Sequence, residues 1–257
     1  MEYLSENSEL LERCHYMRCL TTGIQEGGLT LSSNILVVYK KNFEDVHDKA
    51  LDEVRNTLES LSKEMPIVVD YSAREKVSRT DFIERDLVVV LGGDGTLTSI
   101  AHSVDENTPV MGVNSHPREP DNDGSYGFYM GSDPNNFKED IKRALSEEAI
   151  VNILPRLQAE IFTTSGNIIR SDPALNDLLL ANTHQYQPSK YRLQRKEDGE
   201  NSEINCVQYS SGCLFSTFLG QGAWYRHINN IEGTTFPEQE IDDHYLFVSR
   251  DLPRNDR

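Results

Sequence analysis

A carboxylate stands among three glycines near the middle of the chain. Residues 92–96 read Gly-Gly-Asp-Gly-Thr, which places Asp94 between Gly92-Gly93 and Gly95-Thr96. Because glycine has no side chain and accepts positive φ, a phosphate can approach the backbone N–H groups of such a loop. A carboxylate beside a phosphate needs a reason, since the two repel each other. Asp94 either helps to hold a metal ion or accepts a proton from a hydroxyl that is being phosphorylated. The same letters also fit a tight turn before a helix.

Further polar residues interrupt apolar runs downstream. Asn114 ends the apolar stretch 109–113, and Asn176-Asp177 interrupts the apolar stretch 174–180. Neighbouring strand residues point to opposite faces, so at least one of Asn176 and Asp177 faces the interior and needs a partner. An amide and a carboxylate suit an adenine edge and ribose hydroxyls. A strand start or a bulge is the alternative explanation.

Residues 210–224 are typical of a strand that ends in a glycine turn and enters a helix. The residues of this segment that could contact a ligand are Thr217, Gly220, Gly222, Ala223 and Trp224. A helix that begins after a glycine turn is a ready site for an anion or a nucleotide. A plain strand–turn–helix junction has the same pattern.

The elements that must position these residues alternate along the first half of the chain. Apolar runs predict strands at 34–39, 67–69, 87–91 and 109–113, and the spacing of apolar residues over 46–61 predicts a helix. A polar helical piece near 74–84 and a helix over 96–103 are also expected. This alternation predicts an α/β fold with a Rossmann-like parallel sheet. Residues 117–127 should form a long polar loop that either belongs to a site or is mobile.

The sequence predicts three regions. Residues 1–32 are expected to be an N-terminal extension with a short helix and a Gly27-Gly28 turn, and residues 33–150 the α/β domain that carries the phosphate loop. From residue 151 to residue 257, short strand-like runs alternate with turn clusters. That pattern predicts a β-rich second domain.

The composition indicates a soluble protein with an acidic surface. There are 25 Lys and Arg against 42 Asp and Glu, a net charge of −17, which disfavours nucleic acid and anionic membranes as partners. No stretch approaches the roughly 18 apolar residues of a membrane span. The cysteines, Cys14, Cys19, Cys206 and Cys213, are expected to be ordinary thiols in a reducing compartment. The acidic N-terminus resembles neither a secretory signal nor a mitochondrial presequence.

In order and spacing, these segments resemble the motifs of the NAD kinase family. The similarity rests on Gly-Gly-Asp-Gly-Thr at 92–96, Gly-Val-Asn-Ser at 112–115, Ala-Leu-Asn-Asp at 174–177, and Ser-Ser-Gly at 210–212 with the residues that follow it. The Gly-Val-Asn-Ser-His-Pro and Ala-Trp forms resemble the mitochondrial NAD kinase and plant NADH kinase branch most.

The resemblance implies ATP-dependent phosphorylation of the 2′-hydroxyl of the adenosine ribose of NAD or NADH, with Mg²⁺ offsetting the triphosphate charge. It makes Asp94 the general base, Gly92, Gly93 and Gly95 the phosphate loop, and Thr96 the cap of the helix behind it. Asn114, Asn176 and Asp177 would hold NAD, and Ala223 and Trp224 would line the nucleotide pocket. It also implies a homodimer or higher homo-oligomer and a mitochondrial location, with the cytoplasm as the alternative.

Two departures from the family pattern keep other functions open. Gly220-Gln221-Gly222-Ala223 stands where the family has Gly-Ser-Thr/Lys-Ala, and the β-rich domain is expected to be shortened at its C-terminal end. A non-catalytic or regulatory NAD(P)(H)-binding paralogue is therefore one alternative. A lipid or sugar kinase that shares only the glycine loop is another.

Overall fold

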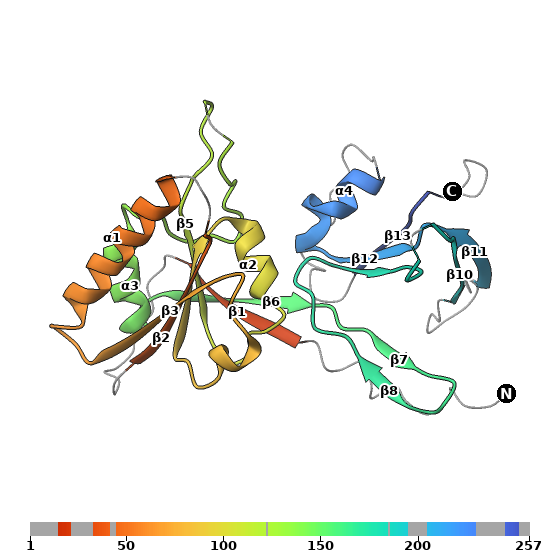
Figure 1. Ribbon diagram of the computed structural model, residues 1–257, viewed down its shortest axis with the longest axis horizontal. Helices are drawn as coiled ribbons and strands as arrows, with labels where there is room; N and C mark the ends of the chain where they lie inside the picture. The colour runs from red at the N-terminus through yellow and green to blue at the C-terminus, as the bar shows by residue number, and fades with distance from the viewer. Residues whose placement is uncertain are drawn as a thin grey trace. The chain divides into compact units, whose positions relative to one another are not determined.

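A computed structural model describes residues 15–21, 33–41, 45–121, 123–184, 186–194, 205–229 and 245–251 of the chain (Figure 1). The chain divides into two compact units, residues 1–156 and residues 157–257, and each is treated by itself. In the described ranges, no helix has both the length and the apolar character needed to cross a membrane.

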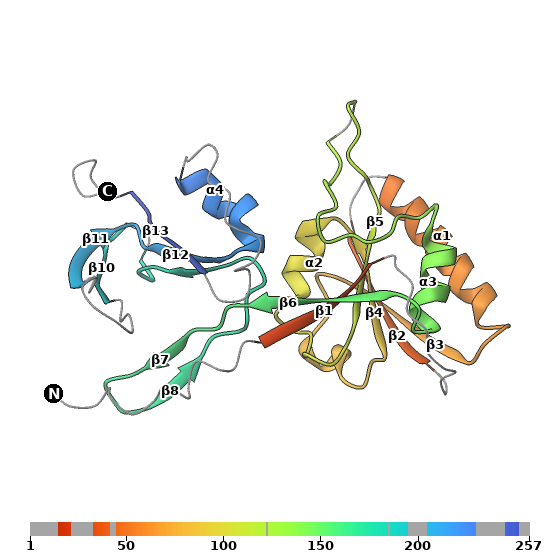
Figure 2. The same cartoon turned by 180° about the vertical axis from the view of Figure 1, so that it is seen from behind.

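The described part of the first unit is a six-stranded sheet with helices on both faces (Figures 1 and 2). Its strands are β1 (His15–Thr21), β2 (Ser33–Tyr39), β3 (Ile67–Ala73), β4 (Leu87–Gly92), β5 (Val110–Asn114) and β6 (Ile150–Arg156). Its helices are α1 (Asp45–Leu61), the 3-10 helix η2 (Arg79–Phe82), α2 (Asp94–Ile100) and α3 (Phe137–Leu145). The strand order is β3-β2-β4-β5-β1-β6, in which only β6 runs antiparallel to its neighbour.

The continuous apolar runs of the sequence form the middle of this sheet. Val88, Val89 and Val90 of β4 have no exposed surface, as expected for a strand that is covered on both faces. In both views, α1 and α3 cover one face of the sheet and α2 covers the other (Figures 1 and 2). The predicted α/β architecture with a parallel sheet is confirmed, apart from the antiparallel edge strand β6.

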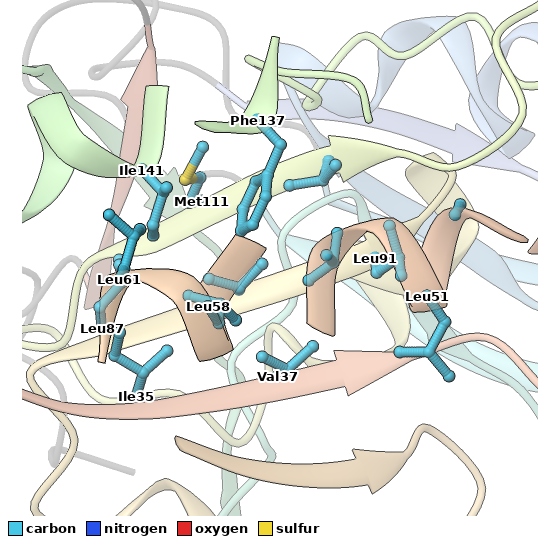
Figure 3. Close-up of a cluster of buried hydrophobic side chains, with 14 of the residues drawn as sticks. Ile35, Val37, Leu51, Leu58, Leu61, Leu87, Leu91, Met111, Phe137 and Ile141 are labelled. Carbon is cyan, nitrogen blue, oxygen red and sulfur yellow. The ribbon is translucent and has the colours of Figure 1, made fainter. Parts of the chain in front are cut away.

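Helix α1 forms because its apolar residues recur at helical spacing. Leu51, Val54, Leu58 and Leu61 are buried along one side of the helix, as predicted. They pack against alternate residues of β2 and β4 and against α3, which contributes Phe137 and Ile141 to the same cluster (Figure 3). The chain leaves the helix before Pro66, which lacks an N–H and cannot continue it.

The prediction of a short helix in residues 1–32 is wrong for residues 15–21, which form strand β1. This strand lies between β5 and β6, parallel to the first and antiparallel to the second. Met17 is fully buried in it. Residues 1–14 and 22–32, with the expected Gly27-Gly28 turn, lie outside the described residues.

The region between the predicted domains contains two elements that the pattern analysis did not assign. Helix α3 could have been found from Phe137, Ile141 and Ala144, which recur at helical spacing. Strand β6 belongs to the sheet of the first unit, so the second unit begins at residue 157 and not at residue 151. Of the polar helical piece expected near 74–84, only the short helix η2 is present.

The second unit consists of short antiparallel strands, as predicted. They are β7 (Glu160–Phe162), β8 (Ile168–Arg170), β9 (Asp177–Leu180), β10 (Ser189–Gln194), β11 (Asn205–Ser210), β12 (Cys213–Thr217) and β13 (Tyr245–Ser249). They pair as β7-β8, β10-β11 and β13-β12-β9. The 3-10 helix η3 (Leu219–Gly222) and helix α4 (Trp224–Asn229) follow β12. Residues 195–204 and the polar ending 252–257 lie outside the described residues.

Two cysteines of the second unit are free thiols. Cys206 is half-buried, and Cys213 is buried in β12. Burial raises the pKa of the Cys213 thiol to about 11, so this group stays protonated and unreactive at neutral pH. The expectation of ordinary thiols is confirmed for these two. Cys14 and the side chain of Cys19 lie outside the described part of the chain.

Candidate active site

Asp94 is the first residue of helix α2, directly beyond the carboxyl end of β4. Its carboxylate accepts three hydrogen bonds from a single returning loop. Ser125 Oγ and the N–H of Gly127 donate to Oδ2 over 3.1 and 3.0 Å, and the N–H of Tyr129 donates to Oδ1 over 2.8 Å. The side chain is half-buried. The carboxylate is therefore held in one orientation at the sheet edge where open α/β folds bind ligands.

The three glycines of the loop have different environments. A Cβ on Gly92 would overlap the side chain of Thr96, and one on Gly93 would lie 2.6 Å from Ser125 Cβ. Packing therefore accounts for glycine at both positions. A Cβ on Gly95 would meet nothing within 4 Å, and this residue is exposed. Gly95 is thus the glycine of this loop that leaves its backbone open to a ligand.

The structure does not support the expected role of Thr96 as a helix cap. Helix α2 begins at Asp94, and Gly93 occupies the N-cap position with extended backbone angles. Thr96 lies inside the first turn and is buried, 2% exposed. Its side chain fills the space that the missing Cβ of Gly92 leaves, so its role is packing.

Asn114 lies beside the glycine loop, as predicted, and is buried. It pairs with Gly92 in the β4–β5 register. Its side-chain amide donates to the carbonyl of Ser125 over 3.1 Å, and its Oδ1 accepts the N–H of His116 over 3.3 Å. Both interactions tie down the two ends of the loop that returns to Asp94. The geometry gives Asn114 a loop-holding role.

The long polar loop after β5 belongs to the site. It extends beyond the sheet edge and returns to it (Figure 1), and the returning residues 125–129 contact Asp94. Gly127 has φ +71°, and a Cβ there would lie 2.7 Å from Asn114 Nδ2. The sequence analysis left this loop undecided and did not single out Ser125 or Tyr129. A glycine followed by aromatic residues, 127–129, was the available signal.

A pocket of about 420 Å³ is lined by Asn114, by residues 126–127 of this loop and by residues of α3. Its lining includes the carboxylates of Asp133, Glu139 and Asp140 and the guanidinium of Arg143. Asp140 already accepts a hydrogen bond from Ser132 Oγ over 2.7 Å. With three acidic groups and one basic group, the pocket is a poor place for a polyphosphate.

In the second unit, the predicted residues Asn176, Thr217 and Gly220 lie together. The N–H of Thr217 donates to the carbonyl of Asn176 over 2.8 Å, and Thr217 Oγ1 donates to the carbonyl of Leu175 over 2.7 Å. The same hydroxyl accepts the N–H of Gly220 over 3.0 Å. A Cβ on Gly220 would overlap the backbone of Asn176. Thr217 and Gly220 therefore fasten the end of β12 to the start of β9, and the Thr217 side chain is engaged inside the protein.

Asp177 is a half-buried carboxylate at the start of β9. Burial raises its pKa above the ordinary value. Within the described residues, no hydrogen bond or ion pair to this carboxylate is present. A desolvated acceptor of this kind gains most from a hydroxyl or N–H brought by a ligand.

The predicted turn and helix after β12 are present as η3 and α4. Gly222 is exposed, and a Cβ there would meet nothing within 4 Å. Ala223 is the C-cap of η3, and Trp224 begins α4 with 40% of its surface exposed. The guanidinium of Arg250 lies 5.2 Å from the centre of the Trp224 ring. One face of the indole is thus covered by a cation.

Residues 29–149 match the family model of the ATP-NAD kinase N-terminal domain. This match shows that the chain is similar to the NAD kinase family over these residues. The NAD kinase resemblance predicted from the motifs is confirmed.

Curated relatives of two kinds match this chain. The "Probable NADH kinase" of Oryza sativa subsp. japonica is 29% identical over 54% of this chain and 44% of its own length. The "NAD kinase" of Pseudomonas fluorescens (strain SBW25) is 30% identical over 54% of this chain and 43% of its own length. The chain thus spans less than half the length of these relatives.

The fold is also that of a solved NAD kinase. The NAD kinase of Archaeoglobus fulgidus, solved in complex with ATP, superimposes with a TM-score of 0.54 at 20% identity. The match covers 84% of this chain and 71% of the archaeal chain. At this identity the comparison establishes the fold and extends the likeness into the β-rich second unit.

Proposed function

We propose that this protein is an NAD(H) kinase, which transfers the γ-phosphoryl group of ATP to the 2′-hydroxyl of the adenosine ribose of NAD or NADH. The observation that carries the proposal is the oriented carboxylate of Asp94 beside the open backbone of Gly95. A fixed base next to a loop that a phosphate can approach is the pair of groups that phosphorylation of a hydroxyl requires. The matched ATP-NAD kinase N-terminal domain supports the choice of substrates.

In the proposed reaction, the 2′-oxygen forms a bond to the γ-phosphorus as the bond between that phosphorus and the β–γ bridging oxygen breaks. ADP leaves with the bonding electrons, and the proton of the 2′-hydroxyl passes to the carboxylate of Asp94. Phosphoryl transfer demands little covalent chemistry from a protein beyond positioning and charge stabilisation. The three hydrogen bonds to Asp94 supply the positioning.

The residues proposed to hold the adenosine lie in the second unit. Asp177 offers a half-buried acceptor for ribose hydroxyls, and the neighbouring Asn176 offers an amide to the adenine edge. Trp224 has its exposed indole surface for stacking, beside Ala223 and the exposed Gly222. We propose that this unit selects the nucleotide and that the first unit carries the base.

Mg²⁺ is proposed to enter with the triphosphate. The described residues contain no group of three His, Cys, Asp or Glu side chains arranged around one ion. The donor set therefore fits a cation held mainly by phosphate oxygens and water. Its charge would offset that of ATP, which matters on a chain with a net charge of −17.

A second candidate is an NAD(P)(H)-binding protein that does not transfer phosphate. It is favoured by the hydrogen bonds that Asp94 makes to its own loop, because a carboxylate can also serve purely to hold a loop. The Gly220-Gln221-Gly222 turn, which departs from the family pattern, supports the same candidate.

One assay separates these candidates. The purified protein is given ATP and Mg²⁺ with NAD or NADH, and the formation of NADP or NADPH is measured. We expect turnover that falls about 10²- to 10⁴-fold in Asp94→Asn, the range that general bases contribute, with an unchanged circular dichroism spectrum. Nucleotide binding by calorimetry without turnover would favour the second candidate. Phosphorylation of a lipid or a sugar in place of NAD would contradict both.

The assembly and the location are proposals from the family resemblance. We propose a homodimer or a larger homo-oligomer, and a mitochondrial location. Light scattering after gel filtration measures the first, and fractionation of the source cells measures the second. A monomer at assay concentrations, or a purely cytoplasmic protein, would contradict them.

A further inference from the structure

We propose that Ser125 positions the general base and that Oδ1 of Asp94 is the atom that receives the proton. This inference rests on the proposed function, because it assigns roles within that reaction. Ser125 does not contact the reacting atoms in the proposed mechanism. It acts through Asp94 and is therefore a positioning residue.

The hydroxyl of Ser125 has one proton, and its surroundings direct that proton to Asp94. The N–H of Asp94 donates to Ser125 Oγ over 3.1 Å, and the N–H of Gly127 approaches the same oxygen at 3.4 Å. With these donors at its lone pairs, the hydroxyl acts as a donor toward Asp94 Oδ2, 3.1 Å away. Ser125 thus binds both the backbone and the side chain of Asp94.

The two oxygens of the Asp94 carboxylate accept different numbers of hydrogen bonds. Oδ2 accepts from Ser125 Oγ and from the N–H of Gly127, whereas, among the residues that the structure describes, Oδ1 accepts only from the N–H of Tyr129. A carboxylate oxygen has two lone pairs, so these donors fill Oδ2 and leave one lone pair of Oδ1 open. A substrate hydroxyl therefore meets Oδ1, and its proton goes to that oxygen.

Gly93 is what allows Ser125 to come this close. A Cβ on Gly93 would lie 2.6 Å from Ser125 Cβ and 2.7 Å from Ser125 Oγ. Any side chain at position 93 would displace Ser125 from Asp94. The second glycine of the loop is thus explained by the approach of Ser125.

The test is a double-mutant cycle of Ser125→Ala and Asp94→Asn. Without the hydroxyl, the carboxylate keeps only its two backbone hydrogen bonds, from Gly127 and Tyr129, and is held less tightly, while the residues proposed for nucleotide binding are untouched. We expect kcat to fall about 10- to 100-fold, as misplacement of a catalytic group by about 1 Å does, with KM for NAD and ATP within about 2-fold. In the Asp94→Asn background, Ser125→Ala should lower the residual turnover no further, because Ser125 acts only through the carboxylate that this background lacks.

The matched control is Ser132→Ala. Ser132 also donates to an aspartate of the first unit, Asp140, over 2.7 Å, but neither residue contacts Asp94. We expect Ser132→Ala to lower the melting temperature at least as much as Ser125→Ala does and to leave kcat unchanged. An equal loss of kcat in both variants would overturn the inference, as would a loss of turnover that adds to that of Asp94→Asn.

Failure of the inference and failure of the proposed function give different results. If the wild-type protein makes no NADP, or Asp94→Asn retains wild-type turnover, the proposed function or its general base fails. If Asp94→Asn is inactive and Ser125→Ala has wild-type kcat, the base stands, and the positioning role of Ser125 is refuted.

Discussion

At the scale of single residues, the site depends on which groups are already engaged inside the protein and which are open. Thr96, Asn114 and Thr217 are buried and serve packing or loop holding. Gly95 and Asp177 differ from them, since one has open space beside it and the other is a carboxylate without a partner in the described part of the chain. Packing inside the protein does not explain the residue type at these two positions, whereas contact with a ligand does.

Gly95→Ala separates ligand approach from folding. The new methyl group meets nothing within 4 Å and the position lies in a helix, so we expect the free energy of unfolding to rise by about 0.4–1 kcal/mol. We expect phosphate transfer to be strongly reduced, because the methyl group covers the backbone that a phosphate would approach. Thermal unfolding and the NADP assay measure the two effects. Gly92→Ala is the contrast and should destabilise, and wild-type activity in Gly95→Ala would exclude a phosphate contact there.

Asp177→Asn should stabilise the unliganded protein and weaken nucleotide binding. The folded-state pKa of Asp177 is raised, so the folded protein holds this proton more tightly than the unfolded chain does. Stability is therefore lost as pH rises from the ordinary aspartate pKa to the raised value. Asparagine at this position cannot ionise, so the variant does not lose this stability. We expect its free energy of unfolding at pH 7 to exceed that of the wild type by less than about 1 kcal/mol, because water screens a half-exposed group.

Denaturant unfolding of the Asp177→Asn variant at pH 7 and at pH 3 checks the sign, since the gain should vanish at pH 3. Calorimetry with NAD should show about 10- to 100-fold weaker binding, the value of a hydrogen bond to a charged group. A gain that persists at pH 3 would mean that burial of the charge is not its cause.

At the scale of elements, helix α2 is fixed at both ends by residues distant in sequence. Ser125 and the backbone of the returning loop bind Asp94 at its first residue. Beyond its last turn, Arg156 of β6 donates to the carbonyls of Ala101 and Val104 over 2.6 and 2.7 Å. A cation at the carboxyl end of a helix also complements the helix dipole. The seven-residue helix that carries the candidate base is thus held from two sides.

Arg156→Ala should be strongly destabilising. Arg156 is 4% exposed, and its loss leaves two carbonyl oxygens without this donor and a space in the core. We expect the free energy of unfolding to fall by about 2–4 kcal/mol. Arg170→Ala is the control, because its ion pair with Glu160 is exposed and should contribute less than about 1 kcal/mol. Urea unfolding of both variants makes the comparison, and equal losses would contradict the role given to Arg156.

At the scale of the whole molecule, an acidic chain is proposed to bind acidic ligands. A net charge of −17 produces a long-range field that repels ATP and NAD, and capture must come from local groups. Arg250, over Trp224, is one such group in the second unit. The field acts over a Debye length, whereas a hydrogen bond acts only on contact.

Adding salt to a solution of low ionic strength should therefore strengthen nucleotide binding. Raising NaCl from 10 to 150 mM shortens the Debye length from about 30 to about 8 Å and screens the repulsion. We expect KM for ATP to fall about 2- to 5-fold, a modest change because the groups in contact are screened much less. Steady-state kinetics at constant free Mg²⁺ measure it, with uncharged adenosine as a competitor whose inhibition should change little. A KM that rises with salt would mean that the local field at the site is positive.

The sequence by itself determined the central strands and helix α1 of the first unit and singled out Asp94 as the candidate base. The run Leu87–Leu91 was sufficient to predict a strand buried on both faces, and the spacing from Leu51 to Leu61 was sufficient to predict α1. Both signals lie within one strand or a few helical turns, where periodicity alone reports burial. Asp94 was found for the same reason, since glycines and a carboxylate that follow a strand form a local pattern.

Only the tertiary structure decided what these elements hold in place. The insertion of β1 between β5 and β6, the return of Ser125 to Asp94 and the reach of Arg156 to α2 join residues 31 to about 140 positions apart. No short window of sequence contains both partners of such a contact. Which residues meet depends on the space and on the unpaired hydrogen-bond donors that remain once the sheet has formed. The loop after β5 was therefore ambiguous in the sequence, and its hydrogen bonds to Asp94 assign it to the site.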